Sequence, residues 1–247
     1  MPSPVIETNK LTKKFGDFVA VDEITFEVQP GEIFGFLGAN GAGKTTAMRM
    51  LCGLSFPTSG SANVGGYDVY NENELIKKHI GYMSQKFSLY EDLTILENIR
   101  FYGGIYGLTN KQIKGKSEEL ISFLELKNEE KKLVKGLPIG WKQKLAFAVA
   151  IIHQPKIVFL DEPTGGVDPV TRRQFWDLIY DASSRGITVF VTTHYMDEAE
   201  YCDRVSMMVD GSIKALDSPS NLKKQYKTSS MDDVFYQLAR GAKRTAD

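Results

Sequence analysis

A glycine-rich run between an apolar segment and a helix-favouring segment is the strongest constraint on how this sequence folds. The run reads Gly38, Ala39, Asn40, Gly41, Ala42, Gly43, Lys44 and Thr45, which fits the pattern G-x-x-x-x-G-K-[ST]. Residues 33–37 predict a strand before it, and residues 45–51 predict a helix after it that Gly53 ends. Glycines let successive backbone N–H groups turn inward, and the helix N-terminus adds a positive dipole. The sequence therefore predicts a phosphate-binding loop rather than an ordinary glycine-rich turn.

The residues of this loop have distinct expected roles toward a nucleoside triphosphate. The backbone that would surround the phosphate oxygens belongs to Gly38, Asn40, Gly41, Ala42 and Gly43. Lys44 places a positive charge at the β- and γ-phosphates. The Thr45 hydroxyl is suited to bind Mg²⁺.

Two carboxylates follow a second apolar run. Residues 157–160 predict a buried strand, and Asp161 and Glu162 come directly after it. Parallel sheets bind ligands at the carboxyl ends of their strands. We expect Asp161 to hold Mg²⁺ and Glu162 to orient or deprotonate the attacking water. A solvated acidic strand end is the alternative.

One of the three histidines stands in a similar position. His194 follows the apolar residues 188–192, so it is expected at the end of another strand. A lone histidine is more often structural than catalytic. We interpret His79 and His153 as structural, because neither has such a context.

Short apolar runs alternate with helical patterns along the whole chain. Strands are predicted at residues 32–37, 80–83, 156–160, 188–192 and 204–209. Helices are predicted at residues 45–51, 93–106, 111–126, 140–152 and 169–184. This alternation predicts an α/β fold, a P-loop NTPase core with a mixed, mainly parallel sheet.

The helical patterns are not evenly distributed. Residues 86–154 are almost wholly helical, so we expect a helical lobe inserted into a core formed by residues 1–85 and 155–220. Asp210-Gly211 predicts a hairpin turn, followed by a short strand and a helix near residues 219–224. Residues 221–247 are expected to form a C-terminal helical tail with an amphipathic segment at 231–238. We expect residues 1–247 to form a single domain.

The composition excludes several classes of protein. Basic and acidic residues nearly cancel, 30 against 31, and no long basic run suggests a nucleic-acid partner. Two distant cysteines are too few for a disulfide framework and fit a reducing compartment. No run of about eighteen apolar residues and no signal peptide is visible, so a cytoplasmic location is expected.

Five elements, in order, resemble the nucleotide-binding subunit of an ATP-binding cassette (ABC) transporter. They are the phosphate loop, Gln85, Leu-Asp-Glu-Pro-Thr at 160–164, Gly166-Val167-Asp168, and His194. The resemblance implies ATP and Mg²⁺ as cofactors. It implies that Gln85 reaches the Mg²⁺ and the water, that His194 contacts the γ-phosphate, and that Asp168 lies at a dimer seam, where it contributes to nucleotide binding.

Three further positions take roles from the resemblance. Phe15 matches the aromatic residue that stacks on adenine, although it could be an ordinary edge aromatic, and Thr46 matches a contact to the α-phosphate. The signature Leu-Ser-Gly-Gly-Gln is replaced by Leu137-Pro138-Ile139-Gly140-Trp141. The serine and the first glycine are lost, while Gly140 keeps the second glycine that faces the partner's nucleotide.

The resemblance also implies partners. Such cassettes pair head to tail and drive integral membrane permeases, so we expect a second cassette, in a homodimer, and a peripheral location on the inner face of the cell membrane. The segments 192–200 and 229–235 look like those of bacterial exporters with separate permeases. An importer cassette, a soluble ABC ATPase without a permease and an inactive regulatory subunit are the alternatives. An inactive subunit should lack Glu162 or His194, and both are present.

Overall fold

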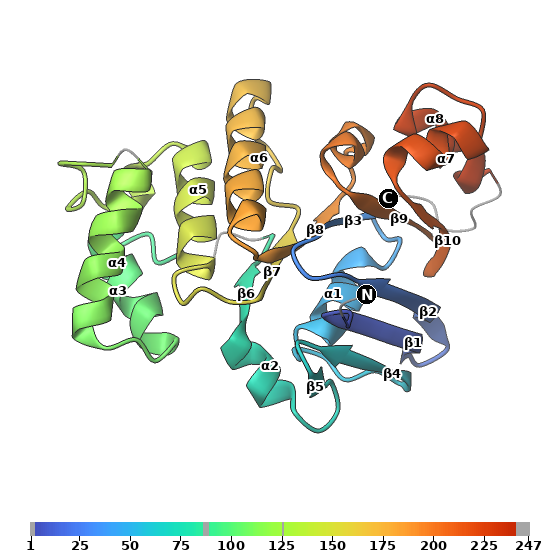
Figure 1. Cartoon of the computed structure of the whole chain (residues 1–247), viewed down its shortest axis with the longest axis horizontal. Helices are drawn as coiled ribbons and strands as arrows, with labels where there is room; N and C mark the ends of the chain where they lie inside the picture. The colour runs from blue at the N-terminus through green and yellow to red at the C-terminus, as the bar shows by residue number, and fades with distance from the viewer. Residues whose placement is uncertain (1–2, 86–88, 125, 241–247) are drawn as a thin grey trace.

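A six-stranded sheet forms the centre of the computed structural model, which describes residues 3–85, 89–124 and 126–240 (Figure 1). Its order is β10 (Ser212–Asp217), β9 (Arg204–Val209), β3 (Ile33–Leu37), β8 (Thr188–Thr193), β7 (Ile157–Asp161) and β6 (Ile80–Met83). All neighbouring strands pair in parallel except β9 and β10. The predicted mixed, mainly parallel sheet is confirmed. The five strands predicted by residue range are present, as is the short strand predicted after the hairpin turn.

The hairpin between β9 and β10 turns where the sequence predicts it. Asp210 and Gly211 have φ angles of 50° and 86°, and Val209 pairs with Ser212 across the turn. Two central residues with positive φ match the twist of antiparallel strands, and glycine adopts this conformation without strain.

A second, four-stranded antiparallel sheet was not predicted. It has the order β2 (Phe18–Val28), β1 (Ile6–Phe15), β4 (Ser59–Val64) and β5 (Tyr67–Asp68). The pairing of β1 with β2 and β4 shifts register at several points, and Lys10 and Glu23 adopt positive φ. These irregularities interrupt the alternation of apolar and polar residues, which is the signal that identifies such strands in a sequence.

The central sheet is buried on both faces. Phe34 and Phe36 of β3 place their ring centroids 5.3–5.6 Å from those of Phe26 and Phe190, on the face toward α1 and the second sheet. Leu37 belongs to the cluster on the other face, beneath α5 and α6. Strands covered on both faces read as continuous apolar runs, which explains why these strands were recognisable in the sequence.

Eight α-helices and two short 3₁₀ helices complete the described part of the chain. They are α1 (Lys44–Leu51), α2 (Asn73–His79), α3 (Ile95–Ile105), α4 (Asn110–Phe123), η1 (Val134–Gly136), α5 (Ile139–Ala150), α6 (Pro169–Ser184), η2 (Met196–Tyr201), α7 (Pro219–Gln225) and α8 (Met231–Ala239). All of the predicted helices are found, whereas α2, with Ile76 as its single buried residue, was not predicted. Within the described ranges, none of the helices combines the length and apolar character needed to cross a bilayer.

Helices α3, α4 and α5 gather at one end of the molecule, away from the second sheet (Figure 1). Capping boxes start two of them: Thr94 with Glu97 at α3, and Thr109 with Gln112 at α4. Residues 86–88 and 125 of the expected lobe, and 241–247 of the expected tail, lie outside the described residues. The division into core, lobe and tail stays a prediction.

Candidate functional site

The glycine-rich run forms a tight loop between β3 and α1. Gly43 precedes α1 with φ 106°, and a Cβ there would lie 2.5 Å from the carbonyl oxygen of Ala20. A Cβ at Gly38 would overlap the carbonyl oxygen of Met208. Side chains at either position would therefore clash with main-chain atoms. The helix axis of α1 points its positive end into the enclosed space, as anion binding requires.

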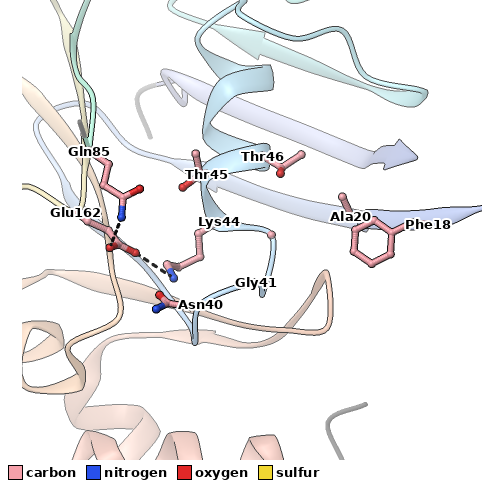
Figure 2. Close-up of a pocket in the computed structure, with 10 residues that line it drawn as sticks. Phe18, Ala20, Asn40, Gly41, Lys44, Thr45, Thr46, Gln85 and Glu162 are labelled. Carbon is pink, nitrogen blue, oxygen red and sulfur yellow. Dashed lines mark hydrogen bonds and ion pairs between the residues drawn. The ribbon is translucent and has the colours of Figure 1, made fainter. Parts of the chain in front are cut away.

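A cavity of about 390 Å³ opens above this loop (Figure 2). It is lined by Phe18, Ala20, Asn40, Gly41, Gly43, Lys44, Thr45, Thr46, Gln85 and Glu162. Most of the residues predicted to hold the triphosphate thus share one cavity. Gly38 and Ala42 belong to the loop behind the lining, where Ala42 is 5% exposed.

Lys44 is buried and directed into its own loop. Its Nζ donates to the carbonyl oxygens of Gly38 at 2.8 Å and Ala39 at 3.0 Å, and lies 3.4 Å from Oε1 of Glu162. Burial lowers the pKa of Lys44, while the carboxylates of Glu162 and Asp161 act in the opposite direction. A phosphate group in the cavity would give this ammonium a charged partner, which forms a stronger hydrogen bond than a carbonyl does.

The predicted metal ligands Thr45 and Asp161 are adjacent. Oδ1 of Asp161 accepts hydrogen bonds from Thr45 Oγ1 at 3.1 Å and from Thr192 Oγ1 at 2.6 Å. Burial raises the pKa of the Asp161 carboxyl above its usual value, although these two hydrogen bonds act in the opposite direction. A nearby cation would favour the charged form. Thr192 was not predicted from the sequence, because its contact with Asp161 depends on the pairing of β8 with β7.

These residues fit Mg²⁺. The ion prefers oxygen ligands, and it is usually held by one or two carboxylates together with waters and substrate phosphates. A carboxylate and a hydroxyl beside a phosphate-binding loop supply that set. No group of three or more His, Cys, Asp or Glu side chains forms a separate metal site in the described residues. When bound, Mg²⁺ neutralises charge on the phosphates.

Glu162 is the point at which the predicted catalytic residues meet. Its backbone adopts φ 50°, and its N–H donates to the backbone oxygen and hydroxyl of Thr192, both at 3.1 Å. Gln85 Nε2 donates to Glu162 Oε2 at 3.0 Å (Figure 2). His194 Nδ1 lies 3.1 Å from the same oxygen but is not aligned for a hydrogen bond. This geometry would let Glu162 accept a proton from a water molecule beside Gln85 and His194, and the catalytic roles of the three residues stay predictions.

The aromatic wall of the cavity is Phe18, which was not predicted from the sequence. Phe15 and Phe18 pair directly across the β1–β2 hairpin, so both project from the same face. Phe18 lines the cavity, whereas Phe15, 57% exposed, lies outside the lining with the Lys13 ammonium 5.1 Å from its ring centroid. The predicted contact of Phe15 with adenine stays a prediction.

A pair of alanine substitutions locates the adenine contact. Phe15→Ala should weaken ATP binding by about 1–3 kcal/mol, the range for base stacking, if its ring carries the base. Loss of the same size in Phe18→Ala, with Phe15→Ala unchanged, would assign the contact to Phe18. Both variants are titrated with ATP to measure the change in affinity. Inorganic triphosphate, which has no base, serves as the control ligand.

Gly140 and Asp168 lie outside this cavity. Pro138 is the N-cap of α5, and Gly140 occupies the first turn of that helix. Asp168 is the N-cap of α6, where it accepts hydrogen bonds from the N–H groups of Val170 and Thr171. The predicted contacts of both residues with a nucleotide held by a second cassette stay predictions.

Replacing Gly140 with Ala should destabilise the fold. An added Cβ would overlap Cγ2 of Thr171, whose hydroxyl is held by a hydrogen bond to Asp168 at 2.5 Å. Overpacking of this kind costs about 1–3 kcal/mol, measurable as a lower urea midpoint. Thr171→Ser removes only Cγ2 and should restore most of the loss in the double variant. An unchanged midpoint in Gly140→Ala would contradict this packing.

The sequence profile of the ABC transporter family matches residues 21–165, more than half of the chain. The match includes the glycine loop and both carboxylates. The chain belongs to the ABC transporter family. As a cassette of this family it is an ATPase, and its nucleotide and ion are ATP and Mg²⁺.

Two relatives are similar to this chain over nearly its whole length. The chain is 48% identical over 239 residues to YbhF of Escherichia coli (strain K12), a probable multidrug ABC transporter ATP-binding protein. The match covers 95% of this chain and 41% of YbhF. The chain is 35% identical to the Nod factor export ATP-binding protein I of Paraburkholderia xenovorans (strain LB400), covering 90% and 73% of the two chains. The cassette thus spans about two-fifths of the length of YbhF.

Solved structures share the fold. An ATP-binding subunit of an ABC transporter superposes with a TM-score of 0.85 at 25% identity, covering 95% of this chain and 99% of that one. The cassette MJ0796, in a dimeric post-hydrolysis state with ADP and Pi, gives a TM-score of 0.77 at 24% identity, covering 86% and 98%. The predicted P-loop NTPase fold is confirmed.

Proposed function

We propose that this cassette hydrolyses ATP to drive export through integral membrane permeases that are separate polypeptides. The observation that carries the hydrolytic part is the meeting of Lys44, Gln85 and His194 around the carboxylate of Glu162. A buried acceptor beside a phosphate loop is what activation of water requires. Export is supported by the names of both relatives, a probable multidrug transporter and a Nod factor exporter.

A second cassette completes the proposed working unit. Gly140 and Asp168 are placed away from the cavity of their own chain, so a nucleotide contact from them needs another copy in a head-to-tail arrangement. We propose a homodimer. Because the matched region covers 41% of YbhF, a second cassette within one longer polypeptide is the competing arrangement.

The proposed location is the inner face of the cell membrane, with the cassette bound peripherally to its permeases and without contact to nucleic acid. The near balance of 30 basic and 31 acidic residues supports the absence of a nucleic-acid partner, since nucleic-acid binding relies on a basic surface.

Reconstitution with the permeases tests this function. The cassette is co-expressed with the membrane proteins encoded beside it, purified in detergent and placed in proteoliposomes. ATPase activity should rise when the permeases are present, and transport should proceed toward the side away from the cassette. Lys44→Ala should abolish transport and keep the complex. Transport toward the cassette would indicate an importer, and failure of every neighbouring membrane protein to bind would indicate a soluble ATPase.

A further inference from the structure

A buried carboxylate joins two segments that carry hydrolytic residues. Glu198 of η2 is fully buried, and its Oε1 accepts a hydrogen bond from Thr164 Oγ1 at 2.5 Å. Thr164 is also fully buried and follows Glu162 by two residues. Nε of Arg172 lies 3.7 Å from the same Glu198 oxygen. A buried carboxylate is costly unless it is paired, so these partners determine where Glu198 lies.

Arg172 extends this connection to the histidine. Its guanidinium carbon lies 4.1 Å from the ring centroid of Tyr195, and Nη1 lies 3.4 Å from Asp197. The rings of Tyr195 and His194 lie 4.2 Å apart. The backbone N–H of Arg172 donates to the carbonyl oxygen of Asp168 at 2.9 Å, the ordinary hydrogen bond of the first turn of α6. The side chain of Arg172 thus contacts the segment after the histidine, and its link to the segment after the acidic pair runs through Glu198 and Thr164.

Neither Glu198 nor Arg172 lines the nucleotide cavity. We propose that the two are positioning residues for hydrolysis: together they hold the segment after Glu162 and the segment around His194 at a fixed separation. This role rests on ATP hydrolysis by the cassette and does not depend on the transport function proposed above. Glu162 Oε2 and His194 Nδ1 lie 3.1 Å apart, and small displacements of catalytic groups are costly in rate.

The phosphate loop is not part of this connection, so binding and hydrolysis should respond differently. Loosening the Thr164–Glu198 hydrogen bond should lower kcat and leave the Kd for ATP unchanged. A purely structural role would instead reduce stability without a specific effect on kcat.

Matched substitutions separate these roles. Thr164→Val keeps the shape and removes the hydroxyl, and it should lower the single-turnover rate about tenfold, the size of a modest misplacement. Thr164→Ser keeps the hydroxyl and should restore the rate. Thr8→Val is the control, because Thr8 is also buried and hydrogen-bonded, to Phe26 in the second sheet. It should lower stability and leave the rate unchanged. Equal rates for Thr164→Val and Thr8→Val would overturn the positioning role.

Nuclear magnetic resonance of the histidine side chains tests the positioning role without a measurement of turnover. The chain has three histidines, so their imidazole nitrogen resonances can be assigned by substitution. Thr164→Val and Glu198→Gln should shift the resonances of His194 and leave those of His79 and His153 in place. Glu198→Gln keeps an acceptor for Thr164 but removes the negative charge that faces Arg172, so it loosens the connection at Arg172 and serves if Thr164→Val does not fold. An unchanged His194 in both variants would overturn the inference.

Discussion

Glu162→Gln should bind ATP with the affinity of the unmodified cassette and hydrolyse it about 10²–10⁴-fold more slowly, the range for loss of general-base catalysis. The amide has nearly the shape of the carboxylate but cannot accept a proton from water. Lys44 should keep its contacts to Gly38 and Ala39, because neither depends on Glu162. A nucleotide that binds and is not cleaved should raise the fraction of ATP-bound dimer above that of the unmodified cassette at the same protein concentration, measured by size-exclusion chromatography with MgATP.

Glu32→Gln provides the matched control for this substitution. Glu32 is also buried, at 7% exposure, and its Oε1 lies 3.2 Å from Nη1 of Arg204, away from the cavity. The control should alter stability and leave kcat unchanged. If Glu162→Gln turns over at nearly the rate of the unmodified cassette, Glu162 is not the general base, and Gln85 and His194 become the residues to test.

The central sheet could be predicted because its signals are local. Strands buried on both faces are continuous apolar runs, and Pro169 and Gly186 mark the start and stop of α6. The second sheet could not be predicted in the same way. Its strands are half exposed and bulged, and their pairing joins β1 to β4 across two intervening strands, the phosphate loop and a helix. That pairing is decided by packing rather than by local sequence.

The site residues also differ in whether local sequence or long-range pairing determines their role. The glycine loop and the Asp161-Glu162 pair were predicted from residue pattern and strand position, because both depend on short segments. Phe18 and Thr192 were missed, since each acts by its place opposite a distant segment. Thr192 lies on β8 beside β7, where its hydroxyl reaches Asp161, and no feature of its own neighbourhood indicates this.

The altered signature gives the second large expected effect. Pro138 stands at the N-cap of α5 and offers neither an N–H nor a hydroxyl, and the exposed Ile139 begins the helix. In a head-to-tail dimer each composite site should lose about 1.5–3 kcal/mol of charge-assisted hydrogen bonding to the γ-phosphate. The isolated cassette should therefore dimerise weakly with ATP and show low ATPase activity that rises with protein concentration.

Pro138→Ser with Ile139→Gly should reverse the weak dimerisation and the low ATPase activity. Both composite sites change at once, so the ATP dimer should tighten by roughly 3–6 kcal/mol, twice the value for one site, and basal hydrolysis should increase. Serine at an N-cap also stabilises its helix by about 0.5–2 kcal/mol, so unfolding without nucleotide must be measured separately. Pro138→Ala with Ile139→Gly restores the N–H alone, and its difference from the serine variant isolates the hydroxyl.

The two measurements are the ATPase rate and the dimer fraction, each recorded against protein concentration with MgATP. If the unmodified cassette turns over rapidly at all concentrations, Pro138 does not weaken the dimer. If the serine variant gains thermal stability but no dimer, the effect of Pro138 is confined to capping α5. Tightening that needs the serine hydroxyl would place the N-terminus of α5 against the γ-phosphate of the second cassette, because capping alone acts equally on monomer and dimer.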